Sequence, residues 1–63
     1  MSLAKLNPIV VILMQRDDFP LRDALEALED ARMEVFEHGR DPAEVLLEEL
    51  GLEPDYIFDL IGD

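Results

Sequence analysis

Side chains that could carry out catalysis are scarce in this 63-residue chain. It contains no Cys and no Thr, its one Ser is Ser2, and its one Lys is Lys5. A nucleophilic hydroxyl or thiol needs a neighbouring base, and these residues cannot supply such a pair. No glycine-rich loop precedes an expected helix, so no phosphate-binding loop is predicted. We therefore expect no enzymatic activity, no catalytic residue and no cofactor.

His38 is the one histidine and the best candidate for a metal ligand. In a helix, Glu34 would lie one turn before it and Asp30 two turns before it, so the three could line one face. A metal site needs more ligands and a supporting second layer of hydrogen bonds. A histidine near a helix C-terminus is also favoured by the helix dipole. We interpret His38 as structural and predict no metal site.

Three pairs of adjacent acids, Asp17-Asp18, Glu29-Asp30 and Glu48-Glu49, suggest acid–base chemistry at first sight. Adjacent residues in a helix diverge by about 100° around its axis, so their carboxylates do not face each other. We predict that these pairs are solvated surface.

The charge is strongly negative and unevenly distributed. The net charge is −11, and all 16 acids lie after Arg16. Binding to a phosphate backbone needs a basic surface, so the composition argues against nucleic acid as a direct partner. A basic protein is compatible with this charge. The acidic partner face expected on the central helix comprises Asp23, Glu26, Asp30, Glu34 and Glu37.

The acids would be positioned by a central amphipathic helix, predicted over residues 20–38. Its apolar stripe recurs at three-, four- and seven-residue steps, and acids occupy the rest of the circumference. Gly39 suits the left-handed position that ends a helix. Met33 leans toward the polar side, where with Phe36 or Phe58 it would form an exposed apolar patch. The predicted stripe consists of Leu21, Leu25, Leu28, Val35 and Phe36, with Ala24 and Ala31.

Capping signals predict three further helices. Asn7-Pro8 begins one over 8–16, and Asp41-Pro42-Ala43-Glu44 resembles a capping box that begins one over 42–50. Gly51 ends the latter, and Leu52 is expected to pack back on its last turn. A short helix over 54–61 must dock between the central and third helices, because alone it would be marginal in water. The third helix is expected to direct inward Val45, Leu46, Leu47 and Leu50.

We therefore predict a single all-α domain over residues 1–63, with three to four short helices in a small orthogonal bundle and a loosely ordered segment over 1–6. The stretch 9–14 is apolar on every side, and four of its residues are β-branched, so a strand over 9–14 followed by helices in a dimer is the alternative. A helix that is apolar all round has few neighbours in so small a chain, and a lone strand has nothing to pair with. Both readings predict a homo-oligomer, first a dimer, through Ile9, Val10, Ile12 and Leu13.

No membrane association is expected, because the run over 9–14 is far shorter than the roughly 20 residues that cross a bilayer. It also lacks a cleavage site for export, and with no cysteine to form disulfides a cytoplasmic location is predicted.

Two segments, LMQRDDFPLRDALEALEDAR and DPAEVLLEELGLEPDYIFDLI, resemble an uncharacterised family of short acidic helical proteins from bacteria, phages and plasmids. The similarity covers Leu13 to Ile61. In that family an Arg-Asp turn joins two helices and a Leu-Glu-Pro-Asp-Tyr segment closes the chain. Family members have Gly in place of Asp18 and a Ser-type cap in place of Pro20. The resemblance implies a helical fold and no activity, since the family has no known function.

The expected function is that of a small, acidic, non-enzymatic interaction or regulatory protein that acts through oligomerisation and protein binding. One alternative is a nucleic-acid mimic that binds a basic protein through its acidic face. The other is a dimeric strand–helix–helix DNA-binding regulator, in which Lys5, Gln15 and Arg16 would lie near the DNA.

Overall fold

The computed structural model describes residues 6–62, so the expectation of a loosely ordered segment over 1–6 lies, except for Leu6, outside the described residues. The helices are α1 (Pro8–Arg16), α2 (Leu21–Phe36), α3 (Pro42–Val45) and α4 (Ile57–Ile61). A π-helical turn, η2 (Leu46–Leu50), continues α3, and a 3-10 turn, η3 (Pro54–Tyr56), precedes α4. The prediction of an all-α fold is confirmed, with helix boundaries close to those expected.

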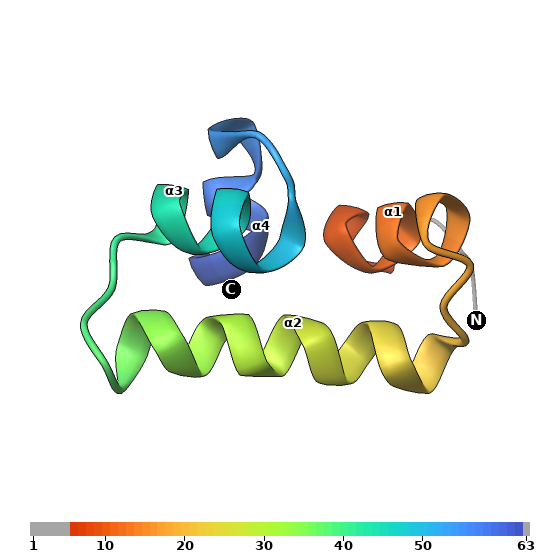
Figure 1. The fold of residues 1–63 in the computed structure, drawn as a ribbon, viewed down its shortest axis with the longest axis horizontal. Coiled ribbons are helices and arrows are strands. Elements are labelled where there is room, and N and C mark those ends of the chain that lie inside the picture. The colour runs from red at the N-terminus through yellow and green to blue at the C-terminus, as the bar shows by residue number, and fades with distance from the viewer. Residues whose placement is uncertain (1–5, 63) are drawn as a thin grey trace.

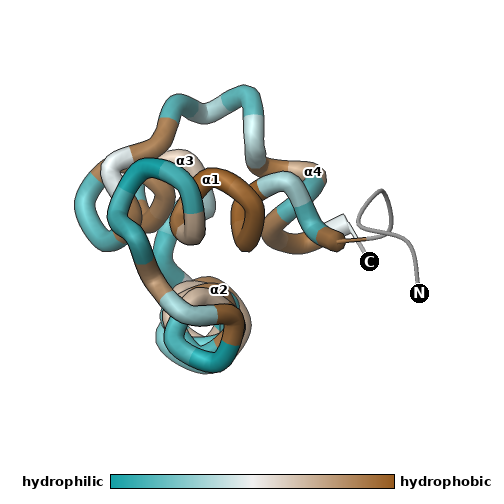
Figure 2. Tube along the Cα trace, turned by 90° about the vertical axis from the view of Figure 1, so that its right-hand side faces the viewer, coloured by the Kyte–Doolittle hydropathy of each residue, from teal (hydrophilic) through white to brown (hydrophobic). Residues whose placement is uncertain are grey.

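α2 is the long base on which the other elements lie. α1 runs back along its first half, and α3, η2 and α4 cover its second half (Figure 1). Viewed from the end of α2, the apolar α1 lies above it, with α3 and α4 to either side in projection (Figure 2). The alternative of a strand over 9–14 is wrong, because Pro8–Arg16 is helical. No helix within residues 6–62 has the length and apolarity needed to cross a membrane.

The predicted caps begin two of the helices. The Asn7 side chain accepts a hydrogen bond from the backbone N–H of Ile9 at 2.8 Å, and that of Asp41 accepts one from Ala43 at 3.0 Å. Both bonds satisfy amide groups that the first helical turn leaves unpaired. Glu44 does not complete a capping box, because its carboxylate binds Arg40 instead.

Three helical segments end in the same way. A residue with positive φ follows each segment, and the next N–H donates to the carbonyl six residues earlier. The three residues are Asp18 at φ 58°, Gly39 at φ 68° and Gly51 at φ 66°. The returning bonds run from Phe19 to Leu13, from Arg40 to Glu34 and from Leu52 to Leu46. Leu52 is buried as a result, which confirms that it packs back on the third helical segment.

The core lies between α2 and the elements above it, and α1 contributes its centre. Ile9 and Val10 are fully buried and Leu13 is 1% exposed, while Ile12 is half-buried. The premise that the chain cannot cover this segment is wrong, because α2 and α4 both contact α1. Ile9, Val10 and Leu13 therefore do not offer a free surface for oligomerisation.

The side of α2 that faces the core is not the side that carries most of its large apolar residues. Its buried residues are Ala24, Leu28 and Ala31, whereas Leu25 and Phe36 are exposed. Small side chains at the contact let neighbouring helices approach closely, which favours the alanine side. On η2, Leu46 and Leu50 are buried as expected, but Leu47 is exposed.

Candidate interaction face on α2 and α4

Large apolar side chains remain exposed along one flank of α2 and on α4. Phe58 is 82% exposed, Phe36 64%, Met33 49% and Leu25 43%. Single exposed apolar residues are ordinary, but a contiguous group of them marks interaction sites. We call these four residues the α2–α4 face. Met33, Phe36 and Phe58 are each exposed, as the predicted patch around Met33 requires, and Met33 and Phe36 line the same groove.

Two grooves run along this face. The larger, of about 600 Å³, lies where α1 begins, and its lining includes Leu25 and Arg32 of α2 and Phe58 and Asp59 of α4. The smaller, of about 230 Å³, lies farther along α2 and is lined by Glu29, Arg32, Met33, Phe36 and Glu37. Because Arg32 lines both, the two grooves adjoin and form one elongated surface.

Arg32 holds α4 in position at the junction of the grooves. Its Nε donates to the carbonyl oxygen of Leu60 at 2.6 Å, and its Nη2 to that of Asp59 at 3.4 Å. Asn7 Nδ2 donates to the same Asp59 oxygen at 2.6 Å. These donors satisfy carbonyl groups that a helix C-terminus leaves unpaired. They link the short helix that carries Phe58 to α2 and to the start of α1.

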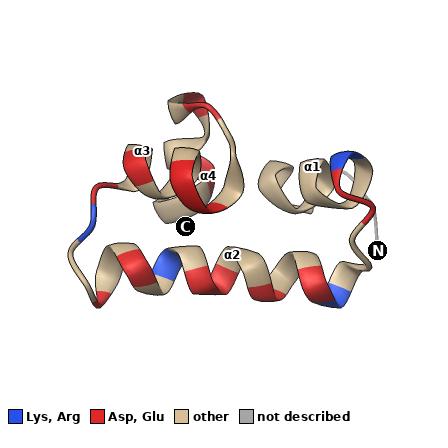
Figure 3. Cartoon of the chain, viewed as in Figure 1, with Lys and Arg blue, Asp and Glu red and all other residues tan. Residues whose placement is uncertain are grey.

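Carboxylates border the apolar residues. Glu29 and Glu37 line the smaller groove, and Asp59 lines the larger one. On a helix, Met33 has as neighbours the residues three and four positions away, which are Glu29, Asp30, Phe36 and Glu37. The face is therefore an apolar surface within a negative surround, and Figure 3 shows acidic residues along the whole of α2.

The five acids of the predicted partner face have two kinds of environment in the structure. Asp23, Glu26, Asp30 and Glu37 are exposed and make no ion pair within residues 6–62. Glu34 lies one turn after Asp30 on the same side of α2, but it is half-buried and contacts Arg40. Four of the five acids thus form a free outer surface, and the fifth has a structural contact.

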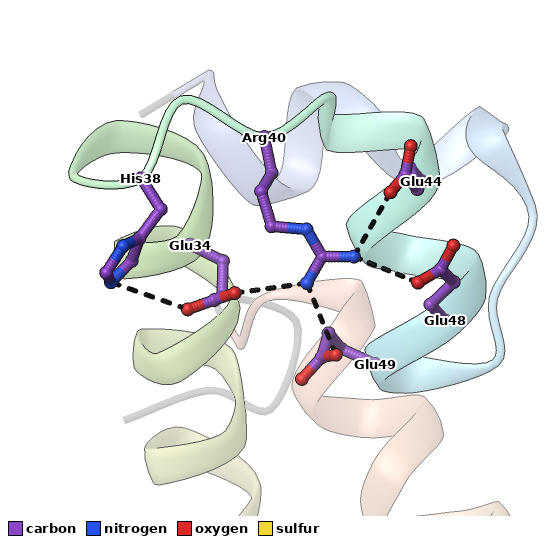
Figure 4. Close-up of polar contacts among 6 residues, drawn as sticks. All are labelled: Glu34, His38, Arg40, Glu44, Glu48 and Glu49. Carbon is purple, nitrogen blue, oxygen red and sulfur yellow. Dashed lines mark hydrogen bonds and ion pairs between the residues drawn. The ribbon is translucent and has the colours of Figure 1, made fainter.

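Arg40 contacts four carboxylates beyond the C-terminal end of α2 (Figure 4). Its Nη1 lies 3.0 Å from Glu34, and its Nη2 lies 3.0 Å from Glu48 and 3.3 Å from Glu44; Glu49 is 3.4 Å from Nη1. The hydrogen bonds that Arg40 donates to Glu34 and then to Glu44 raise the pKa of Arg40 above its ordinary value. The cluster ties the end of α2 to α3 and η2, and we interpret it as structural.

His38 lies at the edge of this cluster rather than in a site of its own. Its Nε2 is 3.6 Å from Glu34 Oε2, and its side chain is well exposed (Figure 4). Within the described part of the chain, no three His, Cys, Asp or Glu side chains are grouped so that they could hold a metal ion.

The sequence reveals the acids and the patch around Met33 but not the grooves. The grooves arise because the wide apolar stripe of α2 contains more large residues than this helix packs inward. Comparisons with family models, curated proteins and solved structures found no match for this chain. The resemblance to short acidic helical proteins stays a prediction, and the function is argued from geometry.

Proposed function

We propose that this protein is a non-enzymatic interaction module that binds another protein through the α2–α4 face. The observation that carries the proposal is the exposure of Phe58 and Phe36 beside two adjoining grooves. Burying a large apolar side chain in a partner contributes roughly 1.5–3 kcal/mol, so aromatic residues of this kind are effective anchors.

The structure leaves fewer residues exposed for the predicted homo-oligomer than the sequence suggests. Of its four predicted interface residues, only Ile12 retains partial exposure. The DNA-binding alternative required a paired strand over 9–14, where the chain is helical. The α2–α4 face is thus the strongest remaining basis for binding another protein.

Affinity capture from an extract of the source cells tests the proposal, with the wild type compared against Phe58→Ser and Phe36→Ser. Both positions are exposed, so the variants should fold normally, as judged by circular dichroism and thermal unfolding. Proteins retained by the wild type should be lost by both. Leu47→Ser is the matched control, because Leu47 is equally apolar and 66% exposed but lies on η2. Equal loss with the control, or no loss with either variant, would refute the proposal.

A further inference from the structure

The α2–α4 face has a shape that suits one kind of ligand. From Leu25 to Phe36 it extends about 16 Å along α2, which is the length of three helical turns. Residues 6–62 contain no strand, so they offer no sheet edge to which an extended peptide could add. An amphipathic helix laid in a groove is the mode of peptide recognition that fits a surface between two helices.

The charge of the surround restricts the ligand further. Glu29, Glu37 and Asp59 line the grooves, and the exposed Glu26 and Asp30 lie on the same helix as the first two. Among the described residues that line the grooves, Arg32 is the one cation, and it donates to backbone carbonyls of α4. An incoming cation therefore meets carboxylates that make no ion pair within residues 6–62, whereas an incoming anion is repelled.

The same charges argue against a second copy of this chain as the occupant. Each copy carries a net charge of −11, and α1, its most apolar helix, carries one cation and is already part of the core. Two such faces in contact would bring like charges together without a compensating basic surface.

We infer that the α2–α4 face binds a basic amphipathic helix of another protein, with apolar residues against Leu25, Met33, Phe36 and Phe58 and with Lys or Arg opposite Glu29, Glu37 and Asp59. This inference rests on the proposed function and adds the chemical class of the partner. The apolar contacts supply affinity, and the carboxylates supply selectivity and faster association.

Three synthetic peptides of about 14 residues, a length of four helical turns, test the inference by fluorescence anisotropy with the full chain. The first two carry Leu at i, i+4, i+7 and i+11. The flanking positions are Lys in the first and Glu in the second, and the third is a scrambled form of the Lys peptide. The Lys peptide should bind, and raised salt should weaken it. The Glu and scrambled peptides should bind at least about tenfold more weakly.

Variants then locate the binding. Glu29→Gln and Glu37→Gln should each weaken the Lys peptide about threefold and reduce its salt dependence. Asp23→Asn is the matched control, because it removes the same charge from α2 at a residue that lines neither groove. Phe58→Ser should weaken binding about tenfold or more, and Leu47→Ser should leave it unchanged. Equal effects of Asp23→Asn and Glu29→Gln would overturn the assignment of the groove carboxylates.

Failure of the inference is distinguishable from failure of the proposed function. If the Glu peptide binds as tightly as the Lys peptide and Phe58→Ser abolishes both, the partner class is wrong but the face is still a binding site. If light scattering shows a dimer that Phe58→Ser dissociates, the occupant is a second copy and the inference is overturned. If no peptide binds, and if the wild type and Phe58→Ser retain the same captured proteins, both proposals are refuted.

Discussion

Arg16, the last residue of α1, donates a hydrogen bond from Nη2 to the carbonyl oxygen of Leu50 at 2.7 Å. Its Nη1 donates to the carbonyl of Gly51 at 3.0 Å, and its other N–H groups bind the carboxylate of Asp17. One guanidinium thus joins the end of α1 to the end of η2, 34 residues later. A planar side chain with five donors is suited to such a junction, which Lys could not form.

Replacing Arg16 with Met should destabilise the chain. The substitution removes the donors to Leu50 and Gly51 but retains an apolar stem, so unpaired carbonyls account for most of the effect. We expect the free energy of unfolding, measured by urea denaturation, to fall by about 1–2 kcal/mol. Arg22→Met is the control, since Arg22 is exposed and has no hydrogen bond or ion pair within residues 6–62; its effect should stay within about 0.5 kcal/mol. A similar loss in both variants would contradict this role of Arg16.

The contact between Arg16 and Asp17 should give stability a pH dependence. The hydrogen bonds from Arg16 lower the pKa of Asp17 in the folded chain. A depressed pKa contributes stability above the unfolded value of about 4, and that contribution is lost as the pH falls through the folded value. Asp17→Asn should therefore be less stable than the wild type at pH 7, and the difference should disappear in acid. In the Arg16→Met background the same substitution should have little pH-dependent effect, which denaturation at several pH values would measure.

Asp18 adopts a backbone conformation that glycine adopts at lower cost. Its φ is 58°, in the region where the Cβ of an L-residue is crowded. Asp18→Gly should therefore raise the free energy of unfolding by about 0.5–1 kcal/mol in thermal or urea denaturation.

The reverse change at Gly51 serves as the comparison for Asp18. Gly51 has φ 66°, and an added Cβ would lie 3.6 Å from Arg16 Nη1, an ordinary contact distance. Gly51→Ala should lower the free energy of unfolding by about 1 kcal/mol through backbone strain alone. If Gly51→Ala raised the free energy of unfolding, or if Asp18→Gly lowered it, φ would not be the cause of these effects.

Leu46 and Leu47 are adjacent, but the structure gives them opposite environments. Leu46 is fully buried, whereas Leu47 is 66% exposed. Leu46→Ala should cost about 2–5 kcal/mol because it leaves a cavity, and Leu47→Ala should cost less than about 0.5 kcal/mol. Equal losses in urea denaturation would mean that η2 faces the core differently. Because both substitutions remove the same atoms from the same helical segment, propensity effects cancel in the comparison.

The sequence by itself determined most helix ends, although it left the stretch 9–14 open between helix and strand. Asn7 and Asp41 signal where two helices begin, and Gly39 and Gly51 where two segments end, because caps and positive φ depend on a few adjacent residues. The free acids on the outside of α2 follow equally from helical periodicity, and so does the exposure of Met33. These features need no knowledge of what lies across the core.

Tertiary structure decided which apolar residues are covered. The run from Ile9 to Leu13 suggests surface that needs a partner, yet α2 and α4 enclose most of it. α2 turns Ala24, Leu28 and Ala31 inward and leaves Phe36 outside, since small residues permit close helix packing. The stripe on α2 is too wide to specify one buried side, and the choice depends on where the neighbouring helices lie. The grooves along the α2–α4 face result from that choice.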